Sequence, residues 1–323
     1  MSESIKRFEA AVVGAGPGGT ACAAELVKLG VKTVLLDRAD FPRLKLCAGW
    51  ITPEVMSDLG FAESDYPYGI TRFDRITFHI SKADIPVRTR QYSIRRYEFD
   101  HWLLSRVRAP FYKHTVRRIR RENGEYDIDG RFRARYLIGA GGTGCPVYRN
   151  LFKKQSPRSE KHLVVTMEKE YKTEFTDAGC HLWFFLNGLP GYGWYVPKQN
   201  GYLNIGIGGK AHRLNKKGRS IQQHFDSFAG MLEANGLVRN RPDRVKGYAY
   251  YLRNPSVRTR TGKAFLIGDA AGIATKDMGE GIGPAVKSGI LAARSIAYNR
   301  PFELKEVNRF SLPELVLSGL CSC

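Results

Sequence analysis

The 323-residue sequence has no apolar run that approaches the roughly 18 residues a membrane-spanning helix needs. Its first nine residues carry four charges and lack the long apolar stretch and small-residue cleavage site of a secretory signal. Repeats of solenoid length and a Pro/Ser-rich linker are also absent. These absences favour a globular, cytoplasmic protein, and the length leaves room for two domains.

Cysteine is scarce and unpatterned. The six cysteines form no CxxC pair at metal-binding spacing and no histidine cluster completes a site, so no metal is expected. We expect free thiols of a reducing compartment at Cys22, Cys47, Cys145, Cys180, Cys321 and Cys323.

Acidic residues are in deficit, since 31 Asp and Glu stand against 51 Lys and Arg, which gives a formal net charge of +20. This excess favours anionic partners such as phosphates, a cofactor pyrophosphate, acidic lipid surfaces or nucleic acid. The basic residues occur in short separated clusters such as Arg120-Arg121, without a basic tail or a nucleic-acid-binding module. We therefore expect most of these charges to be solvated, and we expect no nucleic-acid partner.

What is present begins with a βαβ pattern. Residues 8–13 have the composition of a buried strand, and residues 17–29 that of a helix that ends before Gly30. Residues 33–36 predict a second buried strand, which ends at Asp37.

The turn between the first strand and the helix has GxGxxG spacing at Gly14, Gly16 and Gly19. The first glycine permits a tight turn, the second lets the backbone approach a pyrophosphate, and the third allows close helix–strand packing. The helix start offers unpaired N–H donors, and Asp37 is placed to accept hydrogen bonds from ribose. The pattern predicts a dinucleotide site without separating NAD from FAD. A second literal match at residues 139–144 has no amphipathic helix after it and predicts a tight loop.

The predicted secondary structure changes twice in the rest of the chain. Residues 117–139 predict antiparallel strands, residues 163–209 predict aromatic-rich strands, and residues 221–232 predict one amphipathic helix. A buried strand at 264–267 then precedes a helix over 282–296. Nucleotide-domain character at both ends predicts discontinuous domains: 1–70, 93–160 and 256–323 for the cofactor, and 71–92 and 161–255 for a β-sheet substrate domain.

Three further segments are residues 96–100 (RYEFD), 136–146 (YLIGAGGTGCP) and 264–272 (AFLIGDAAG). They resemble, in this order, the RxxFD element, the GADG loop and the GD motif of the para-hydroxybenzoate-hydroxylase-like flavoproteins. The resemblance implies an FAD whose ribityl chain contacts Asp269 and whose isoalloxazine faces the start of the following helix at Gly281.

Two details of these segments bear on the flavin. A helix start that contains Gly279, Gly281 and Gly283 offers N–H groups that can stabilise negative charge on a reduced flavin. Gly141 replaces the acid of the GADG loop, so the contact usually attributed to that acid is absent.

Other distinctive stretches are residues 42–49 (PRLKLCAG), 191–198 (GYGWYVPK) and 203–208 (LNIGIG). Within that superfamily they resemble the KxCxG loop, which runs along the flavin, the YxWxFPK strand and the NxGxG partner of the geranylgeranyl-reductase family. The resemblance to this family covers residues 8–315. The resemblance implies an α/β protein with a Rossmann-like FAD-binding domain of the GR2 type and an inserted β-rich substrate domain. The cofactor-binding residues that these patterns and resemblances suggest are Gly14, Gly16, Pro17, Gly18, Gly19, Asp37, Arg38, Cys47, Ala48, Gly49, Arg96, Val116, Asp269, Gly281 and Ile282.

The family resemblance implies reduction of an isolated carbon–carbon double bond in an isoprenoid. FADH2 delivers a hydride to one carbon and a proton reaches the other. The implied substrate is hydrophobic, a prenyl diphosphate or a lipid, with peripheral contact to an anionic membrane. The external reductant stays open between NADPH, reduced ferredoxin and a quinol.

The aromatic strands provide a candidate wall for an apolar groove, although the same rings would also serve as core. Strand alternation predicts that Tyr192, Trp194 and Val196 share one face. Cys47 has Arg43 and Lys45 nearby, which suits either an active thiol or a small residue against the isoalloxazine. The catalytic candidates are Cys47, Tyr192 and Trp194, and the pocket candidates are Trp183, Phe185, Tyr192, Trp194 and Val196.

Two polar residues of the insert, His181 and Lys198, are candidates to face substrate. Lys198 either meets a diphosphate or is solvated, as turn lysines usually are. Two alternative functions remain open on the same residues. A flavin monooxygenase is disfavoured by residues 272–276, whereas a halogenase is harder to dismiss because residues 192–197 partly match its WxWxIP strand. The other alternative is a basic Rossmann module without catalysis.

Overall fold

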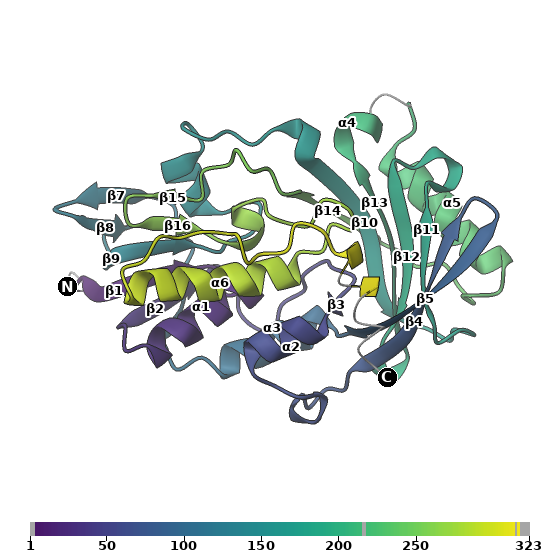
Figure 1. Cartoon of the computed structure of the whole chain (residues 1–323), viewed down its shortest axis with the longest axis horizontal. Helices are drawn as coiled ribbons and strands as arrows, with labels where there is room; N and C mark the ends of the chain where they lie inside the picture. The colour runs from purple at the N-terminus through teal and green to yellow at the C-terminus, as the bar shows by residue number, and fades with distance from the viewer. Residues whose placement is uncertain (1–3, 215–217, 314, 317–323) are drawn as a thin grey trace. The chain divides into compact units, whose positions relative to one another are not determined.

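The computed structural model describes residues 4–214, 218–313 and 315–316 (Figure 1). The chain divides into two compact units, each assembled from separate segments. The first comprises the residues up to Arg43, Tyr97–Arg158 and Tyr251–Arg309. The second comprises Leu44–Arg96, Ser159–Tyr250 and the described residues from Phe310 onward. None of the helices in the described residues is both long enough and apolar enough to cross a membrane.

A mixed sheet forms the centre of the first unit. Its strands are β1 (Lys6–Val13), β2 (Thr33–Asp37), β6 (Phe111–Lys113), β7 (Ile119–Glu122), β8 (Glu125–Ile128), β9 (Phe132–Gly139), β15 (Arg260–Thr261) and β16 (Ala264–Leu266). The main order is β15-β16-β9-β1-β2-β6, and the strands from β16 to β6 run parallel to one another. The hairpin β7–β8 continues antiparallel from β9. This is the parallel sheet that the βαβ pattern predicts.

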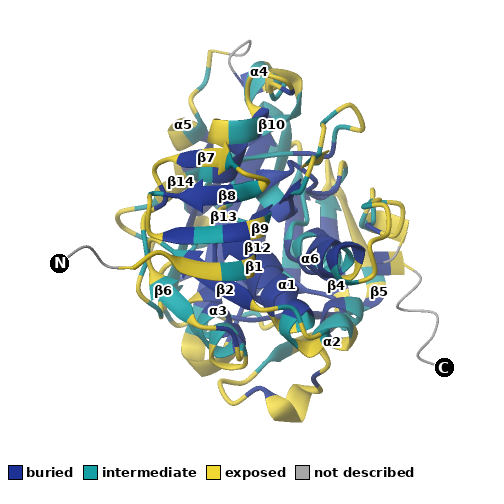
Figure 2. Cartoon of the chain, turned by 90° about the vertical axis from the view of Figure 1, so that its left-hand side faces the viewer, coloured by how far each residue is buried: buried dark blue, intermediate teal, exposed yellow. Residues whose placement is uncertain are grey.

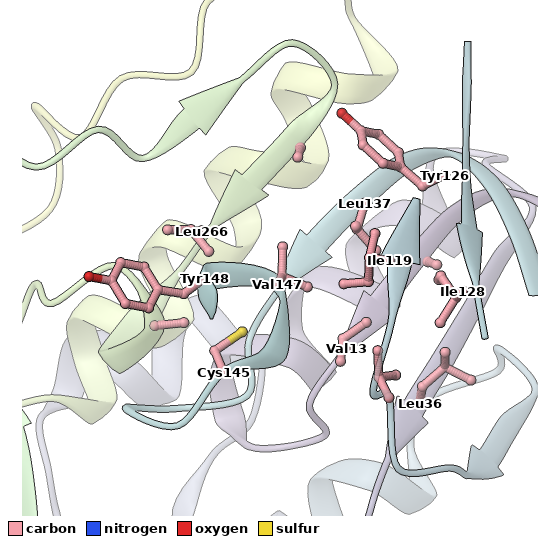
Figure 3. Packing of buried hydrophobic residues seen from close by; sticks show 14 of the residues in the cluster. Val13, Leu36, Ile119, Tyr126, Ile128, Leu137, Cys145, Val147, Tyr148 and Leu266 are labelled. Atoms are coloured by element: carbon pink, nitrogen blue, oxygen red, sulfur yellow. The ribbon is translucent and has the colours of Figure 1, made fainter. Parts of the chain in front are cut away.

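Two helices, α1 (Pro17–Lys28) and α6 (Ile282–Ala297), pack on one face of this sheet and are largely buried (Figure 2). Strand β1 turns Ala10 and Val12 toward these helices and Ala11 and Val13 toward the other face. On that other face, Val13, Leu36 and Leu137 meet side chains of the β7–β8 hairpin and of residues 145–148 (Figure 3). Burial on both faces explains why β1 is a continuous apolar run. A third helix, α3 (Arg96–Ser105), precedes β6 in the chain.

The second unit is built on another eight-stranded sheet. Its strands are β3 (Trp50–Ile51), β4 (Thr71–Ile80), β5 (Ala83–Ser93), β10 (Leu163–Lys172), β11 (Cys180–Phe184), β12 (Gly191–Pro197), β13 (Tyr202–Lys210) and β14 (Lys246–Tyr251). The order is β14-β10-β13-β12-β11-β4-β5-β3, in which β11 and β4 are parallel and β10, β13, β12 and β11 form antiparallel pairs. Helices α2 (Pro53–Leu59), α4 (Ala211–Leu214) and α5 (Ile221–Ala234) belong to this unit.

Helix α5 covers one face of the second sheet. It begins with a capping box, in which Ser220 and Gln223 each accept a hydrogen bond from the other's backbone N–H. Its apolar side packs Phe225 and Phe228 against sheet residues such as Ile205 and Ile207. The opposite face of this sheet is therefore the one that α5 leaves uncovered.

The predicted fold class is confirmed, and residues 139–146 form the predicted loop, followed only by a single helical turn at Tyr148–Phe152. The domain bounds differ from those expected. Residues 44–70 belong to the second unit because Trp50 and Ile51 pair with Ser93 and Tyr92 of β5. Such a two-residue strand carries too little pattern to be recognised in the sequence.

Candidate functional site

The glycine loop between β1 and α1 is held by Asp37. The backbone N–H of Ala15 donates to Asp37 Oδ2 at 2.7 Å, and that of Ala39 donates to Oδ1 at 2.9 Å. Gly19 lies so close to the strand end that a β-carbon there would be 1.8 Å from the carbonyl oxygen of Gly14. The glycine loop thus has a fixed shape, and the Asp37 carboxylate that holds it lies at the end of β2.

Gly16, in contrast, faces open space. A β-carbon on Gly16 would meet only the Arg43 guanidinium, at 3.5 Å from Nη2. Arg43 is itself paired with Asp100, whose side chain is completely buried, at 3.2 Å. The RxxFD element therefore ends in a carboxylate that holds a cation beside the glycine loop, where it can bind a phosphate oxygen. Sequence analysis placed Arg43 near Cys47 instead, and the aspartate of RxxFD was the signal available for this pairing.

The first turns of α1 and α6 lie against each other. A β-carbon on Gly18 would be 2.7 Å from the carbonyl oxygen of Ala285, and one on Gly289 would be 2.4 Å from that of Gly18. Pro17 stands at the first helical position of α1, where its missing N–H leaves no bond unmade. The structure therefore brings together the two helix starts that sequence analysis assigned to one ligand.

The start of α6 differs in detail from the expectation. The N–H of Gly279 donates to Thr275 O at 3.1 Å, and that of Gly283 donates to Glu280 Oε1 at 2.6 Å. The expectation of free N–H groups at these two glycines is therefore wrong, because the loop before α6 bonds to itself. Within the described part of the chain, the N–H groups of Gly281 and Ile282 donate to no other residue. Asp269 Oδ1 lies 3.4 Å from the β-carbon position of Gly281.

Arg158 joins the two remaining loops of the first unit. Its guanidinium donates to Thr143 O and Ala270 O, both at 2.7 Å, and stacks on the Tyr148 ring at 3.7 Å. Burial lowers the pKa of Arg158, and nearby Tyr148 partly opposes this. Arg158 thus clamps the 139–146 loop to the GD loop, a role that no local sequence signal indicates.

The structure gives less support to the remaining predicted cofactor residues. Arg38 is exposed, and the Val116 side chain belongs to the core, so Val116 can offer a ligand only its backbone. Cys47, Ala48, Gly49 and Arg96 lie in the second unit. Their cofactor contacts stay predictions.

The aromatic candidates divide between the two faces of the second sheet. Tyr192 and Trp194 contact each other, with ring centroids 6.0 Å apart, on the face away from α5. Trp183 lies on the α5 face, where it contacts Phe228 at 5.4 Å. Phe185 follows the end of β11 in a left-handed conformation and is 64% exposed. The prediction of one wall containing all of these rings is wrong for Trp183 and Phe185, while Val196 is buried on the strand that carries Tyr192 and Trp194.

His181 also lies on the α5 face. Its Nδ1 is 3.0 Å from Nε2 of His79, whose Nδ1 is 2.7 Å from Asp84 Oδ1. Burial lowers the pKa of His181, and Asp177 at 3.1 Å opposes this. His181 is thus a member of a histidine pair beneath α5, on the face opposite Tyr192 and Trp194.

Lys198 is not the solvated lysine that its turn position suggests. It is 3% exposed, and its Nζ donates to Ala48 O at 2.6 Å and to Ile94 O at 2.5 Å. Glu170 Oε2 lies 3.6 Å away, and Glu170 is held in turn by Arg95 at 2.9 Å. The expectation fails because Lys198 reaches the Cys47 loop, which is about 150 residues earlier in the sequence.

The same loop is held at two further points. Asn204 Nδ2 donates to Cys47 O at 3.3 Å, while its Oδ1 accepts from Trp194 Nε1 at 2.7 Å. Gly49 has a φ of +70°, and a β-carbon there would be 2.0 Å from Ile94 O. The KxCxG, YxWxFPK and NxGxG segments, recognised separately in the sequence, thus form one hydrogen-bonded assembly in the second unit.

The comparisons with known proteins agree with this arrangement. The family model of the NAD(P)-binding Rossmann-like domain matches residues 12–60. The chain is 30% identical to the uncharacterized protein Mbar_A1602 of Methanosarcina barkeri, over 91% of this chain and 76% of that protein. It is 27% identical to the geranylgeranyl diphosphate reductase of Rhodobacter capsulatus, over 93% of this chain and 78% of that enzyme.

The chain belongs to the geranylgeranyl-reductase-like family of FAD-dependent oxidoreductases.

Solved structures support the fold of this flavoprotein. A geranylgeranyl bacteriochlorophyll reductase-like protein of Thermoplasma acidophilum superposes with a TM-score of 0.79 at 19% identity, covering 98% of this chain and 83% of that one. The flavin-dependent brominase Bmp2 superposes with a TM-score of 0.71 at 17% identity, covering 91% and 79%. The family assignment answers the alternative of a module without catalysis. The halogenase alternative stays open, because proteins that share a fold can catalyse different reactions.

The described cysteines of this flavoprotein are free, as predicted for those four. Burial raises the pKa of the Cys22, Cys145 and Cys180 thiols, so they stay protonated and unreactive. Cys47 is half-buried, and its Sγ accepts the N–H of Gly49 at 3.3 Å. Cys321 and Cys323 lie outside the described residues.

Glu168 of this flavoprotein is a buried acid that sequence analysis missed. It lies on β10, two residues before Glu170, and is 2% exposed. Burial raises the pKa of Glu168 to about 7, against the opposing effect of Lys45 and Lys198. A single glutamate in an amphipathic strand carries no sequence signal of burial, because its environment is set by neighbouring strands.

The Glu168 carboxyl makes stability depend on pH. Between pH 4.5, its ordinary pKa, and about 7, the folded protein retains a proton that the unfolded chain has lost. The free energy of unfolding of the wild type, relative to Glu168→Gln, therefore falls as pH rises, by about 1.4 kcal/mol per pH unit at most. Urea unfolding at several pH values from 5 to 8 measures this difference. Glu174→Gln, at an exposed site, is the control, and we expect its free energy of unfolding relative to the wild type not to change with pH. If the free energies of unfolding of the wild type and of Glu168→Gln changed with pH in the same way, the assignment would be wrong.

Proposed function

We propose that the first unit binds FAD and that the enzyme uses the reduced flavin to saturate an isolated carbon–carbon double bond of an isoprenoid. The observation that carries the proposal is the contact between the starts of α1 and α6, beside an open Gly16. Unpaired amides at two adjacent helix starts suit a ligand with a negative group at each of two positions. A dinucleotide with a pyrophosphate and a reducible ring is such a ligand.

The residues of the first unit fit the parts of FAD. The amides at the start of α1 and the Arg43 guanidinium would bind the pyrophosphate. Asp37 would accept from ribose, since each of its oxygens retains a lone pair beside the bond to Ala15 or Ala39. Asp269 would meet the ribityl chain, and the amides of Gly281 and Ile282 would stabilise negative charge on the reduced ring. Bound FAD supplies the hydride of the reaction.

The second unit offers a surface suited to an isoprenoid. On the face away from α5, Phe184 contacts Phe78 at 5.2 Å and Tyr192 at 5.3 Å, which gives a continuous aromatic surface. Beyond Trp194 this surface meets the polar assembly around Lys198. Because Lys198 is committed to backbone carbonyls, we do not assign it to a diphosphate. The name of the Rhodobacter relative supports a prenyl substrate.

Anaerobic reduction tests the proposal. We expect a yellow protein whose flavin, once reduced with dithionite, is reoxidised by geranylgeranyl diphosphate or a prenylated lipid with formation of the saturated product. We expect Asp269→Ala to weaken FAD binding about tenfold or more, because it removes a charge-assisted hydrogen bond. Flavin absorbance and mass spectrometry of the lipid measure both effects.

The same preparation tests the alternative reactions. Reduced enzyme is exposed to oxygen with bromide or chloride and an aromatic acceptor. Halide incorporation, or hydroxylation without alkene reduction, would replace the proposed reaction by that of a halogenase or monooxygenase. Full FAD occupancy in Asp269→Ala would instead contradict the assigned site.

A further inference from the structure

Glu168 lies within the polar and aromatic assembly of the second unit. In the sheet register, Glu168 of β10 and Trp194 of β12 are both paired with Gly206 of β13. A β-carbon on Gly206 would be 2.3 Å from the Trp194 ring and 2.6 Å from Glu168 Cβ. The carboxyl-bearing side chain and the indole therefore meet over one glycine, on the face away from α5.

The carboxyl group has an atom without a partner. Oε1 of Glu168 is buried, and no group in the described part of the chain donates a hydrogen bond to it. A buried carboxylate oxygen that accepts no hydrogen bond is costly, so burial favours the protonated form. A proton carried on Oε1 is donated to no group in the described part of the chain, so it is available to a substrate.

Charged groups from several elements face this carboxyl. Lys45 of the Cys47 loop, Lys198 after β12 and Arg96 at the start of α3 favour its ionised form, and Glu170 of β10 opposes it. Burial raises the pKa of Glu168 to about 7 in spite of these cations. The group can therefore release a proton near neutrality, and the cations are in place to stabilise the carboxylate that remains.

We propose that Glu168 is the general acid of the reduction, giving its proton to one carbon of the substrate alkene while the other carbon accepts hydride. This inference rests on the proposed function. An isolated alkene has no carbonyl to hold negative charge, so hydride cannot add unless a proton is delivered to the neighbouring carbon. The group that delivers it must be acidic, desolvated and close to the double bond.

The electrons and atoms balance as follows. The π pair of the alkene forms a C–H bond with the Glu168 proton, and the O–H pair stays on the carboxylate. The other carbon, left electron-poor, would accept the hydride that bound reduced FAD would supply, and the flavin would thereby lose two electrons. The Trp194 indole, which lies beside Glu168 over Gly206, would stabilise the transient positive charge by a cation–π interaction. Solvent then returns the proton to Glu168, and the external reductant restores the flavin.

Infrared titration tests the protonation of Glu168 independently of substrate. We expect the difference spectrum of wild type minus Glu168→Gln to show a protonated carboxyl band at pH 5 that disappears with a midpoint near pH 7. Glu174→Gln serves as the exposed control. Absence of the band at pH 5 would overturn the proposal, whatever the substrate of the enzyme.

Single-turnover kinetics test the step itself. In Glu168→Gln we expect reoxidation of the reduced flavin by the alkene to be about 100-fold slower, the lower range for general acid catalysis, while FAD affinity and reoxidation by oxygen stay unchanged. In the wild type the rate should fall above pH 7, and this fall should be absent in the variant. An unchanged alkene rate in Glu168→Gln would refute the general acid. Failure of the wild type to react with any alkene, with the infrared band present, would refute the proposed function and with it this role.

Discussion

A Gly16→Val variant is expected to fold like the wild type and to lose about 1,000-fold in affinity for FAD, or about 4 kcal/mol. The backbone of Gly16, with φ of −75° and ψ of −178°, suits a β-branched residue, and its β-carbon position is open apart from Arg43. The valine methyl groups would occupy the space through which a pyrophosphate reaches the amides at the start of α1. Titration of the apoprotein with FAD measures the affinity, and the melting temperature of the apoprotein should change little.

Gly19→Ala is the matched comparison. Its β-carbon would be 1.8 Å from the carbonyl oxygen of Gly14, so the strand end must move for the variant to fold. We expect a clear loss of stability in the apoprotein of Gly19→Ala and not in that of Gly16→Val. Wild-type FAD affinity in Gly16→Val would show that the pyrophosphate does not bind at this loop.

The first unit could be predicted closely because its signals are local. The strand, glycine turn and helix of residues 6–28 follow from apolar runs, Pro17 at the first helical position and Gly30 beyond the last. The nearness of the starts of α1 and α6 was implied by the assignment of one to the pyrophosphate and the other to the isoalloxazine of a single FAD. What could not be predicted was Arg158, because it acts on backbone carbonyls of Thr143 and Ala270, and such bonds leave no requirement on residue type.

The second unit was predicted less well because its site depends on neighbouring strands. Alternation along β12 placed Tyr192 and Trp194 on one face, and their contact agrees. Alternation alone could not relate β11 to β12, since their register puts Trp183 opposite Gly193 and on the α5 face. The burial of Glu168 and of Lys198 was not predicted, for the same reason. Burial of a charged residue is decided by segments far away in the sequence, and a single sequence does not reveal those pairings.

The second large effect is expected for Lys198→Met. The substitution keeps the length of the side chain and removes its donors, leaving Ala48 O and Ile94 O without a partner and Glu170 paired only with Arg95 among the contacts above. Removing one member of a buried, hydrogen-bonded charge network costs about 3–5 kcal/mol. We expect a loss of that size in the free energy of unfolding, measured with urea, whereas Lys172→Met, at an exposed position of β10, should change it by less than about 0.5 kcal/mol.

The Cys47 loop should loosen in Lys198→Met, because Lys198 bonds the carbonyl of Ala48 in the loop and that of Ile94, whose N–H donates to Gly49 O. The test uses a background with serine at positions 321 and 323, in which Cys47 is half-buried and the other three cysteines are buried. In this background, Lys198→Met should accelerate the reaction of Cys47 with a disulfide reagent at least tenfold in native buffer. Should Lys198→Met fail to fold, Asn204→Ala provides a milder test, because it removes the bond to Cys47 O and leaves Lys198 in place. A wild-type thiol rate in Asn204→Ala and in a folded Lys198→Met would mean that the loop is held by other contacts. An accelerated rate with unchanged FAD affinity would separate the anchoring of this loop from the pyrophosphate site of the first unit.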